Sequence, residues 1–386
     1  MRILAIETSC DETAIALIEA KGDLKNPCFK ILKNLVASQI KVHQPFGGIV
    51  PNLAKREHLK NLPILFNKIL KTKNCKLKTD LITVTVGPGL EPCLWVGINF
   101  AEDLAKKWNK PLIGVNHLEG HLYSNLLNPS AKGISASGGK SNILYPAVSL
   151  IISGGHTILL LMKNLTSWKK LGETRDDAVG EAFDKVARML NLPYPGGPEI
   201  EKLAKLGNSE IEFPRPMLNQ KNYDFSFSGL KTSVLYYLRD NKLKTKSYKL
   251  KANIAASFQA AAFDVLISKT LRLAKEFKAK SILISGGVAV NKTLQKQFKR
   301  EIKNRFPLSS FHFPPSSFCG DNAAMVAAAG YINFLQPACL ALPARIATRS
   351  VAGGRSIAGR KKKRRPHTKS SALVRGKLTA QSNLNL

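Results

Sequence analysis

Apolar and polar positions follow the same order twice along the chain. An apolar run over Ile3–Ile6, a polar turn and a second apolar run over Ala14–Ile18 predict a two-stranded hairpin. The same order returns at Ala147–Ile152, a turn of small polar residues, and Ile158–Met162. One such hairpin in each half favours two lobes of similar topology that face each other across a cleft.

Helical spacing and further apolar strands surround the two hairpins. In the first half we expect a helix at 54–70, a strand at 81–86, a helix towards Trp108 and a strand at 111–115. In the second half we expect helices at 177–190, 253–277 and 321–334 and a strand at 281–285. This order predicts an α/β protein with lobes at 1–130 and 131–336, and with a late helix that can complete the first lobe. The boundary is placed in the Ser-, Gly- and Ala-rich stretch 128–142.

The apolar periodicity fades after Pro337. A basic cluster, Arg360–Arg365, stands there among Ser, Thr and Gly residues. Such a composition does not bury enough apolar surface to offset the entropy of ordering the chain. We therefore predict a disordered basic tail over 337–386.

The net charge of the 386 residues is +33. Residues 345–386 hold 12 of the 59 Lys and Arg residues and no Asp or Glu, which leaves 47 basic against 26 acidic residues before residue 345. A basic body favours a polyanionic partner such as nucleic acid, because neutralised phosphates release counterions. A solvated lysine-rich surface is the alternative interpretation.

The spacing of the six cysteines and the polarity of the N-terminal residues disfavour several further classes of protein. The cysteines are scattered without CxxC spacing, which disfavours a zinc ribbon, a redox pair and a disulfide framework. The first residues turn polar too early for a signal peptide, and no apolar run reaches the ~20 residues that span a bilayer. We expect a cytoplasmic protein without a membrane segment.

Two histidines four positions apart are the first candidate chemistry. His117 and His121 would share one face of a helix and could bind one metal ion. They follow an apolar strand, where ligand sites of α/β proteins are built. In the HExxH pattern of zinc proteases a Glu follows the first His, whereas Glu119 stands one position later, which disfavours a metallopeptidase. Two unrelated histidines remain the alternative.

Asp321 is the best candidate for a third ligand. It stands where a predicted helix begins, so it could equally cap that helix. Two histidines and one carboxylate with open positions suit Fe(II) or Zn(II).

Glycine-rich turns follow two apolar strands, at Ser153–Thr157 and at Ser285–Gly287. Their backbone amides could approach an anion or carboxylate, although tight turns also use glycine. Asp11 and Glu12 lie in the matching turn of the first hairpin, which indicates one ligand cleft between the lobes.

Two further polar residues of the second half are candidates. Asn291 follows the second glycine turn and could bind a ligand or cap a helix. Asp184 could accept hydrogen bonds from ribose hydroxyls or form a salt bridge with Arg188.

The ordered motifs together resemble the tRNA N6-adenosine threonylcarbamoyltransferase family (TsaD/Gcp type) in its bacterial form. The matching segments are Ile6–Thr13, Pro45–Pro51, Arg56–His58, Gly87–Leu90, Gly114–His121, Ser153–Thr157, Asp177–Arg188, Tyr194–Pro198, Phe225–Thr232, Gly286–Asn291 and Asp321–Met325. They run in family order to about Phe334, and this ordered set is far more specific than any single segment.

The resemblance implies the ASKHA architecture of actin, Hsp70 and sugar kinases, with two RNase-H-like lobes around a central cleft. It implies one divalent metal, Fe(II) with Zn(II) as the alternative, on His117, His121 and Asp321. It implies an adenylate substrate on Ile151, Ile152, Ser153, Gly154, Gly155, Asp184, Gly197 and Asn291, with Glu201 as a further acidic contact.

The resemblance also implies the reaction. The family transfers a threonylcarbamoyl group from threonylcarbamoyl-AMP to N6 of adenosine 37 in tRNAs that read ANN codons, and releases AMP. Our hypothesis for the base is Asp11, in the turn opposite the glycine loop. The implied partners are tRNA, a non-catalytic paralogue (TsaB type) and a small P-loop ATPase (TsaE type).

Two other functions use the same scaffold. An ASKHA ATPase or phosphotransferase would not need the histidine pair, and a non-catalytic paralogue typically lacks the metal ligands, which this chain has.

Overall fold

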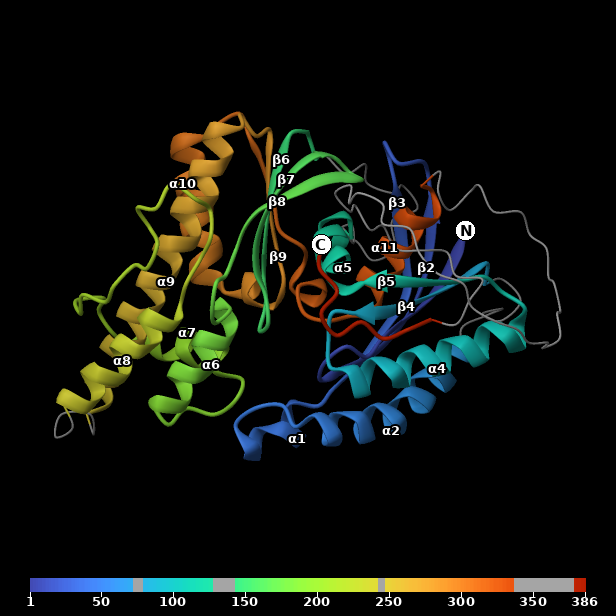
Figure 1. The fold of residues 1–386 in the computed structure, drawn as a ribbon, viewed down its shortest axis with the longest axis horizontal. Coiled ribbons are helices and arrows are strands. Elements are labelled where there is room, and N and C mark those ends of the chain that lie inside the picture. Colours follow the sequence, from blue (N-terminus) through green and yellow to red (C-terminus); the bar gives the residue numbers. More distant parts are fainter. Residues whose placement is uncertain (72–78, 128–142, 242–246, 337–377) are drawn as a thin grey trace, which may run out of the picture.

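Two five-stranded sheets form the frame of the molecule. The computed structural model describes residues 1–71, 79–127, 143–241, 247–336 and 378–386. Figure 1 shows the two sheets next to each other, each with its own helices. The α/β class and the two facing lobes predicted from the repeated hairpin are confirmed.

The first sheet has the order β3-β2-β1-β4-β5. Its strands are β1 (Arg2–Glu7), β2 (Glu12–Lys21), β3 (Cys28–Ser38), β4 (Leu81–Gly87) and β5 (Leu112–Asn116). β1 pairs antiparallel with β2 and parallel with β4, and β4 pairs parallel with β5. Helices cover both faces, so β1 and β4 are nearly continuous apolar runs.

The second sheet repeats this plan with the order β10-β9-β6-β7-β8. Its strands are β6 (Ala147–Ile152), β7 (Thr157–Asn164), β8 (Ser167–Glu173), β9 (Ser281–Ser285) and β10 (Ser310–His312). β6 takes the place of β1: it pairs antiparallel with its hairpin partner β7 and parallel with β9. The carboxyl ends of β1, β4 and β5 and of β6 and β9 are therefore where a cleft between the lobes would be built.

The helices of the first lobe lie on two faces. α2 (Pro51–Leu70) and α4 (Glu91–Trp108) share an apolar cluster with β1 and β4, and α1 (Ile40–His43) and η1 (Gln44–Phe46) precede them. The other face carries α5 (His117–Tyr123), η2 (Ser124–Leu126) and α11 (Ala323–Phe334). α11 comes from the end of the second half and contacts β1, β2, β5 and α5. The first sheet is thus covered by a late helix, while the lobe boundaries stay predictions because 128–142 lies outside the described residues.

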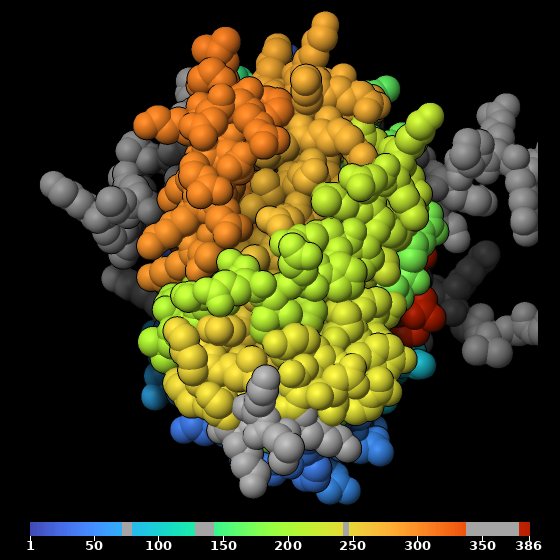
Figure 2. Space-filling view, turned by 90° about the vertical axis from the view of Figure 1, so that its left-hand side faces the viewer, coloured from blue at the N-terminus to red at the C-terminus, as the bar shows by residue number. Residues whose placement is uncertain are grey.

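The second lobe is built around one long helix. Its helices are α6 (Val179–Met189), α7 (Gly196–Ala204), α8 (Ser228–Asp240), α9 (Tyr248–Glu276), η3 (Gly287–Val290), α10 (Lys292–Arg305) and η4 (Ser316–Phe318). Figure 2 shows the outer face of this lobe, with α10 in orange at the upper left and α8 in yellow at the bottom. Within the described residues, only α9 is long and apolar enough to cross a membrane, and 72% of its most apolar window is buried in the protein. α9 is therefore the core helix of its lobe.

The last nine residues require a correction to the predicted tail. Residues 337–377 lie outside the described part of the chain, but Leu378–Leu386 packs on the first lobe. Leu378 is buried, and Gln381 donates its backbone N–H to the Val86 carbonyl over 2.7 Å. The apolar residues of this segment stand on either side of a turn at Ser382 and Asn383: Leu378 and Ala380 come before the turn, and Leu384 and Leu386 follow it. The basic residues before them hid this pattern.

Candidate metal and substrate site

The metal candidates begin at the carboxyl end of a buried strand. β5 ends at Asn116, whose side-chain oxygen accepts the Leu118 N–H over 2.8 Å and caps α5. The first helical residue is therefore His117, and His121 follows one turn later. Their ring centroids lie 4.7 Å apart, which confirms that the two imidazoles share one face of a helix.

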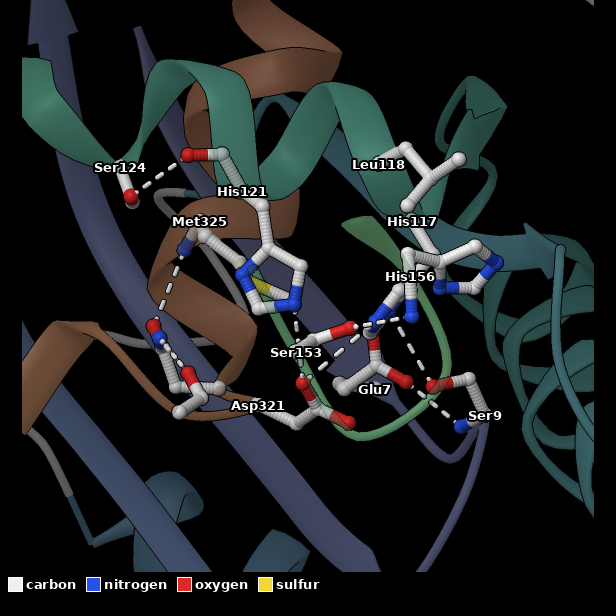
Figure 3. Close-up of polar contacts among 12 residues, drawn as sticks. Glu7, Ser9, His117, Leu118, His121, Ser124, Ser153, His156, Asp321 and Met325 are labelled. Atoms are coloured by element: carbon white, nitrogen blue, oxygen red, sulfur yellow. Dashed lines mark hydrogen bonds and ion pairs between the residues drawn. The ribbon is translucent and has the colours of Figure 1, made fainter. Parts of the chain in front are cut away.

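Asp321 meets the histidines from the far end of the chain. Its Oδ1 lies 3.4 Å from Nε2 of His117 and 3.2 Å from Nε2 of His121. One ligand atom from each of the three residues falls within 4.8 Å of the others, and Figure 3 shows both rings turned towards this carboxylate. The side chain that caps α11 is Asn322, which accepts the Met325 N–H over 3.1 Å. Asp321 is thus not needed as the cap of α11, and its carboxylate faces the two histidines.

The charges of the group suit a cation. Burial opposes a charge on His117, but Asp321 and Glu7 raise the pKa of this histidine well above its ordinary value. Burial likewise opposes a charge on Asp321, but the two histidines lower the pKa of its carboxyl. In the described part of the chain, Nδ1 of His121 is buried without a hydrogen-bond partner. Two imidazole nitrogens and a carboxylate oxygen next to a second buried carboxylate form a donor set that fits a divalent metal ion.

Glu7 is a member of this site that the sequence analysis missed. It is fully buried at the end of β1. One carboxylate oxygen accepts the Ser9 N–H over 2.5 Å, and the other lies 2.6 Å from Thr85 Oγ1 and 3.2 Å from His117 Nδ1. When His117 carries its proton on Nδ1 and donates it to this carboxylate, the lone pair of Nε2 is left for a ligand. A charged residue at the end of an otherwise apolar strand was the signal in the sequence.

The turn after β1 faces the same group. Ser9 Oγ lies 3.2 Å from His117 Nδ1, and Asp11 is buried. His58 of α2 holds the turn, because its Nε2 lies 2.9 Å from the Cys10 carbonyl. Burial, followed by the charge of Asp11, raises the pKa of Glu12 well above its ordinary value. The turn therefore presents two adjacent carboxyls, and the pKa of Glu12 is the raised one.

The glycine turn of the second lobe is open on its outer side. The Ser153 N–H donates to the His156 carbonyl over 2.8 Å, while a Cβ at Gly154 or Gly155 would meet no atom within 4 Å. Ile151 and Ile152 are buried and belong to the two core clusters, so only their backbone could reach a ligand. Figure 3 shows Ser153 and His156 in the same close-up as the metal group.

Two neighbouring backbone segments crowd against this turn. A Cβ at Gly180, at the start of α6, would lie 2.6 Å from the Ser153 carbonyl oxygen. At Gly286, whose φ is +92°, it would lie 2.3 Å from the Ile152 carbonyl oxygen. A Cβ at Gly196, at the start of α7, would lie 2.4 Å from the Ala187 Cβ and 2.8 Å from the Asp184 Cα, so this glycine lets α7 pack closely on α6. These glycines let the β6–β7 turn, the starts of α6 and α7 and the β9 turn come together.

The remaining substrate candidates have partners within the protein. Asp184 Oδ1 accepts the Gly196 N–H over 2.7 Å, and Arg188 donates to the Gly47 carbonyl of the other lobe. Asn291 caps α10 by accepting the Leu294 N–H over 3.0 Å, and its Nδ2 donates to Gln259 over 3.1 Å. Glu201 accepts the Lys292 N–H over 3.0 Å. Gly197 has open space where a Cβ would stand.

Asp11 of the first lobe lies close enough to Asp184 and Tyr194 of the second lobe to affect their pKa values. Burial, two opposing backbone hydrogen bonds and then the charge of Asp11 act on Asp184, and the net effect raises its pKa. Burial, then Asp11 and Asp184, raise the pKa of the Tyr194 phenol. Tyr194 therefore lies between the acidic turn of the first lobe and α6 of the second. In the sequence, Tyr194 stands out only as the first residue of the matching segment Tyr194–Pro198.

The fold and the site together define a two-lobed protein of the ASKHA architecture, with a His–His–Asp group that could hold a metal ion beside its glycine turn. Among solved structures, HypF of T. kodakarensis matches with a TM-score of 0.51 and 16% identity over 87% of this chain and 49% of that one. A full-length HypF in a phosphate- and nucleotide-bound form matches with a TM-score of 0.51 and 12% identity over 88% and 56%. These likenesses concern the fold alone.

The comparison of sequences identifies the family. The family model described as tRNA N6-adenosine threonylcarbamoyltransferase (TsaD) matches residues 30–328. Relatives with that name include one from Listeria monocytogenes serotype 4b (strain CLIP80459), 45% identical over 86% of this chain and 92% of the relative. Another, from Thermosipho melanesiensis, is 48% identical over 86% and 95%. The chain belongs to the tRNA N6-adenosine threonylcarbamoyltransferase family, a family of tRNA-modifying transferases, as its motifs predicted.

Proposed function

We propose that this protein transfers a threonylcarbamoyl group from threonylcarbamoyl-AMP to N6 of adenosine 37 in tRNAs that read ANN codons, with release of AMP. The observation that supports this most directly is the convergence of His117, His121 and Asp321 beside an open glycine turn. Family membership supplies the class of reaction. The residues of the site must then activate the acyl group, bind the adenylate and provide a base.

The adenylate would lie along the glycine turn of the second lobe. Within Ile151–Gly155, the N–H groups of Gly154 and Gly155 are the ones placed to bind it, because these two glycines are exposed and unobstructed. Gly197 is open in the same way, and Asp184 holds the neighbouring Gly196 amide. Asn291 and Glu201 would contact the adenylate through the lone pairs that their capping bonds leave free.

The acyl carbon needs activation because an exocyclic adenine amine is a poor nucleophile. A divalent metal on the His–His–Asp group, Fe(II) in our proposal with Zn(II) as the alternative, would polarise the threonylcarbamoyl carbonyl as a Lewis acid. Glu7 keeps Nε2 of His117 available by accepting from its Nδ1. The amides of Gly154 and Gly155 would stabilise the negative charge that develops on the carbonyl oxygen.

Asp11 would accept the proton that the adenosine amine loses. It is buried in the turn beside the metal group, next to Glu12, whose pKa is raised by burial and by the charge of Asp11. The proton would pass from N6 to the Asp11 carboxylate as the new N–C bond forms, and the bond to the AMP phosphate would break.

We also propose tRNA, a TsaB-type paralogue and a TsaE-type P-loop ATPase as partners, and the cytoplasm as the location. The net charge of +33 supports a polyanionic partner. The family supplies the rest of this proposal.

A transfer assay with purified tRNA and threonylcarbamoyl-AMP tests the function. We expect modified tRNA and AMP in equal amounts from the wild type, and loss of both with His117→Ala or with a chelator. Asp11→Asn should slow transfer without changing metal affinity, and Glu19→Gln, whose carboxylate binds Arg2 at the far end of β1, is the control. Full activity in His117→Ala, or ATP turnover that needs neither tRNA nor metal, would contradict the proposal.

A further inference from the structure

The segment Leu378–Leu386 runs across the carboxyl ends of β4 and β5, where the site is built. Its backbone forms hydrogen bonds with the β4 end: the Gln381 N–H donates to the Val86 carbonyl over 2.7 Å, and the Gly89 N–H donates to the Ser382 carbonyl over 3.2 Å. In Figure 1 this red segment passes beneath β4 and β5 and ends beside α5, next to the second lobe.

The surface under the segment is shaped to receive it. Gly87 has a φ of +151°, and a Cβ there would lie 1.8 Å from the Gln381 carbonyl oxygen. A Cβ at Gly114 would lie 3.1 Å from a methyl carbon of Leu378. Leu378, Ala380 and Leu384 pack into the apolar cluster that β1 and β4 share with α2 and α4. Gly87 and Gly114 thus leave room for the segment, and its backbone hydrogen bonds and apolar contacts give it a fixed register.

Two contacts connect the segment to the metal ligand His117. The first passes through Asn116: its Oδ1 caps α5, and its Nδ2 donates to the Asn385 carbonyl over 3.3 Å. Both bonds of one amide must be kept for the side chain to hold its orientation. Asn385 therefore constrains Asn116, the residue that caps α5 directly before His117.

The second contact passes through the turn after β4. Ser382 accepts from Gly89, and the next residue, Leu90, donates its N–H to the Ser9 carbonyl over 2.8 Å. Ser9 Oγ in turn lies 3.2 Å from His117 Nδ1. The first route reaches the backbone of His117 at the start of α5, and the second reaches Nδ1 of its imidazole.

We infer that Leu378–Leu386 acts as an intramolecular strap that positions His117 for metal binding. The strap contributes no ligand. It acts through Asn116 and through the Gly89–Ser9 contact, so its removal should loosen the histidine and weaken the metal site. The inference deepens the proposed function, but the metal site it describes can be measured without tRNA or adenylate.

A protein that ends at residue 377 tests this, with Co(II) as the probe metal. We expect its Co(II) dissociation constant to rise ~10-fold or more, as when an orienting partner of a metal ligand is lost, and its visible absorption spectrum to change. Adding the nonapeptide LTAQSNLNL should restore both, whereas a scrambled peptide should not. Unchanged affinity and spectrum, or a peptide that binds without restoring them, would show that the segment is only packing and overturn the inference.

A matched pair of variants in the full chain covers the case in which the shortened protein does not fold. Gln381→Pro removes the N–H that Val86 accepts, while Gln381→Ala keeps it. The proline variant should bind Co(II) more weakly and the alanine variant should match the wild type; equal affinities would overturn the strap. If transfer activity is absent in the wild type while Co(II) affinity follows these variants, the proposed function fails and the strap stands.

Discussion

Replacing Glu7 with glutamine should weaken metal binding although no metal ligand changes. The wild-type carboxylate accepts hydrogen bonds on both oxygens: from Ser9 on one, and from Thr85 and His117 on the other. Glutamine has one oxygen and one NH₂ group in the same space. The NH₂ group must therefore take the place of one oxygen and point its hydrogens at a group that donates to that oxygen in the wild type.

Either orientation of the new amide is costly. If its NH₂ faces Nδ1 of His117, the imidazole must accept there and carry its proton on Nε2, the nitrogen that faces Asp321. If the amide flips, its NH₂ meets the Ser9 N–H at the 2.5 Å position. Loss of an orienting carboxylate typically costs ~10–100-fold in metal affinity, which is about 1.4–2.7 kcal/mol. The penalty for one unsatisfied buried donor, about 1–3 kcal/mol, has the same size.

Isothermal titration of the metal-free protein with Zn(II) or Co(II) measures the effect. Glu19→Gln is the matched control, because Glu19 pairs with Arg2 at the opposite end of β1, roughly 17 Å away along the strand. Affinity should fall in the Glu7 variant alone. A Glu7→Gln protein that binds the metal as tightly as the wild type would refute the tautomer argument, even if its transfer activity were low.

Three further predictions concern stability. Chelation should lower Tm, because a ligand at 100 times its Kd adds about 2.7 kcal/mol to the folded state; calorimetry with and without chelator measures this, and equal values would contradict it. Burial, followed by the two metal-site histidines, lowers the pKa of His156 from 6.5 to about 4. Only the unfolded His156 takes up a proton in that window, so the free energy of unfolding should fall as pH drops through it. Urea titrations should show a shallower fall for His156→Gln, and identical slopes would refute this. Gly330→Ala should cost about 1–3 kcal/mol and several degrees of Tm, because its Cβ would lie 2.2 Å from Thr83 Cγ2, whereas Gly229→Ala meets only ordinary contact at 3.7 Å.

Residues whose partners are near in sequence or repeated in pattern could be predicted. The hairpins over Ile3–Ile18 and Ala147–Met162 follow from apolar runs and turn residues alone. The shared face of His117 and His121 follows from helical spacing, which a four-residue separation fixes. These features need no knowledge of tertiary contacts.

Residues whose partners lie far away could not be assigned in the same way. Asp321 and Asn322 are equivalent as caps on sequence grounds, and only the packing of α11 on the first lobe assigns the cap to Asn322. Asn291 was predicted as either a ligand contact or a cap. The structure shows the cap through its Oδ1, together with a bond from its Nδ2 to Gln259, 32 positions away. Glu7 was passed over because its partners, Thr85 and His117, come from two other segments.

The origin of Asp321 explains why the histidine pair alone is not a site. The pair belongs to α5 on the first sheet, whereas Asp321 stands between η4 of the second lobe and α11, which returns to cover the first sheet. The ligand set is therefore complete only when both sheets have formed and α11 has docked against α5. A metal ion that binds this set adds its binding free energy to that docking. By this reasoning, an Asp321→Ala protein should lose the metal while α11 stays packed, because the cap belongs to Asn322, whereas a disrupted α11 should lose both.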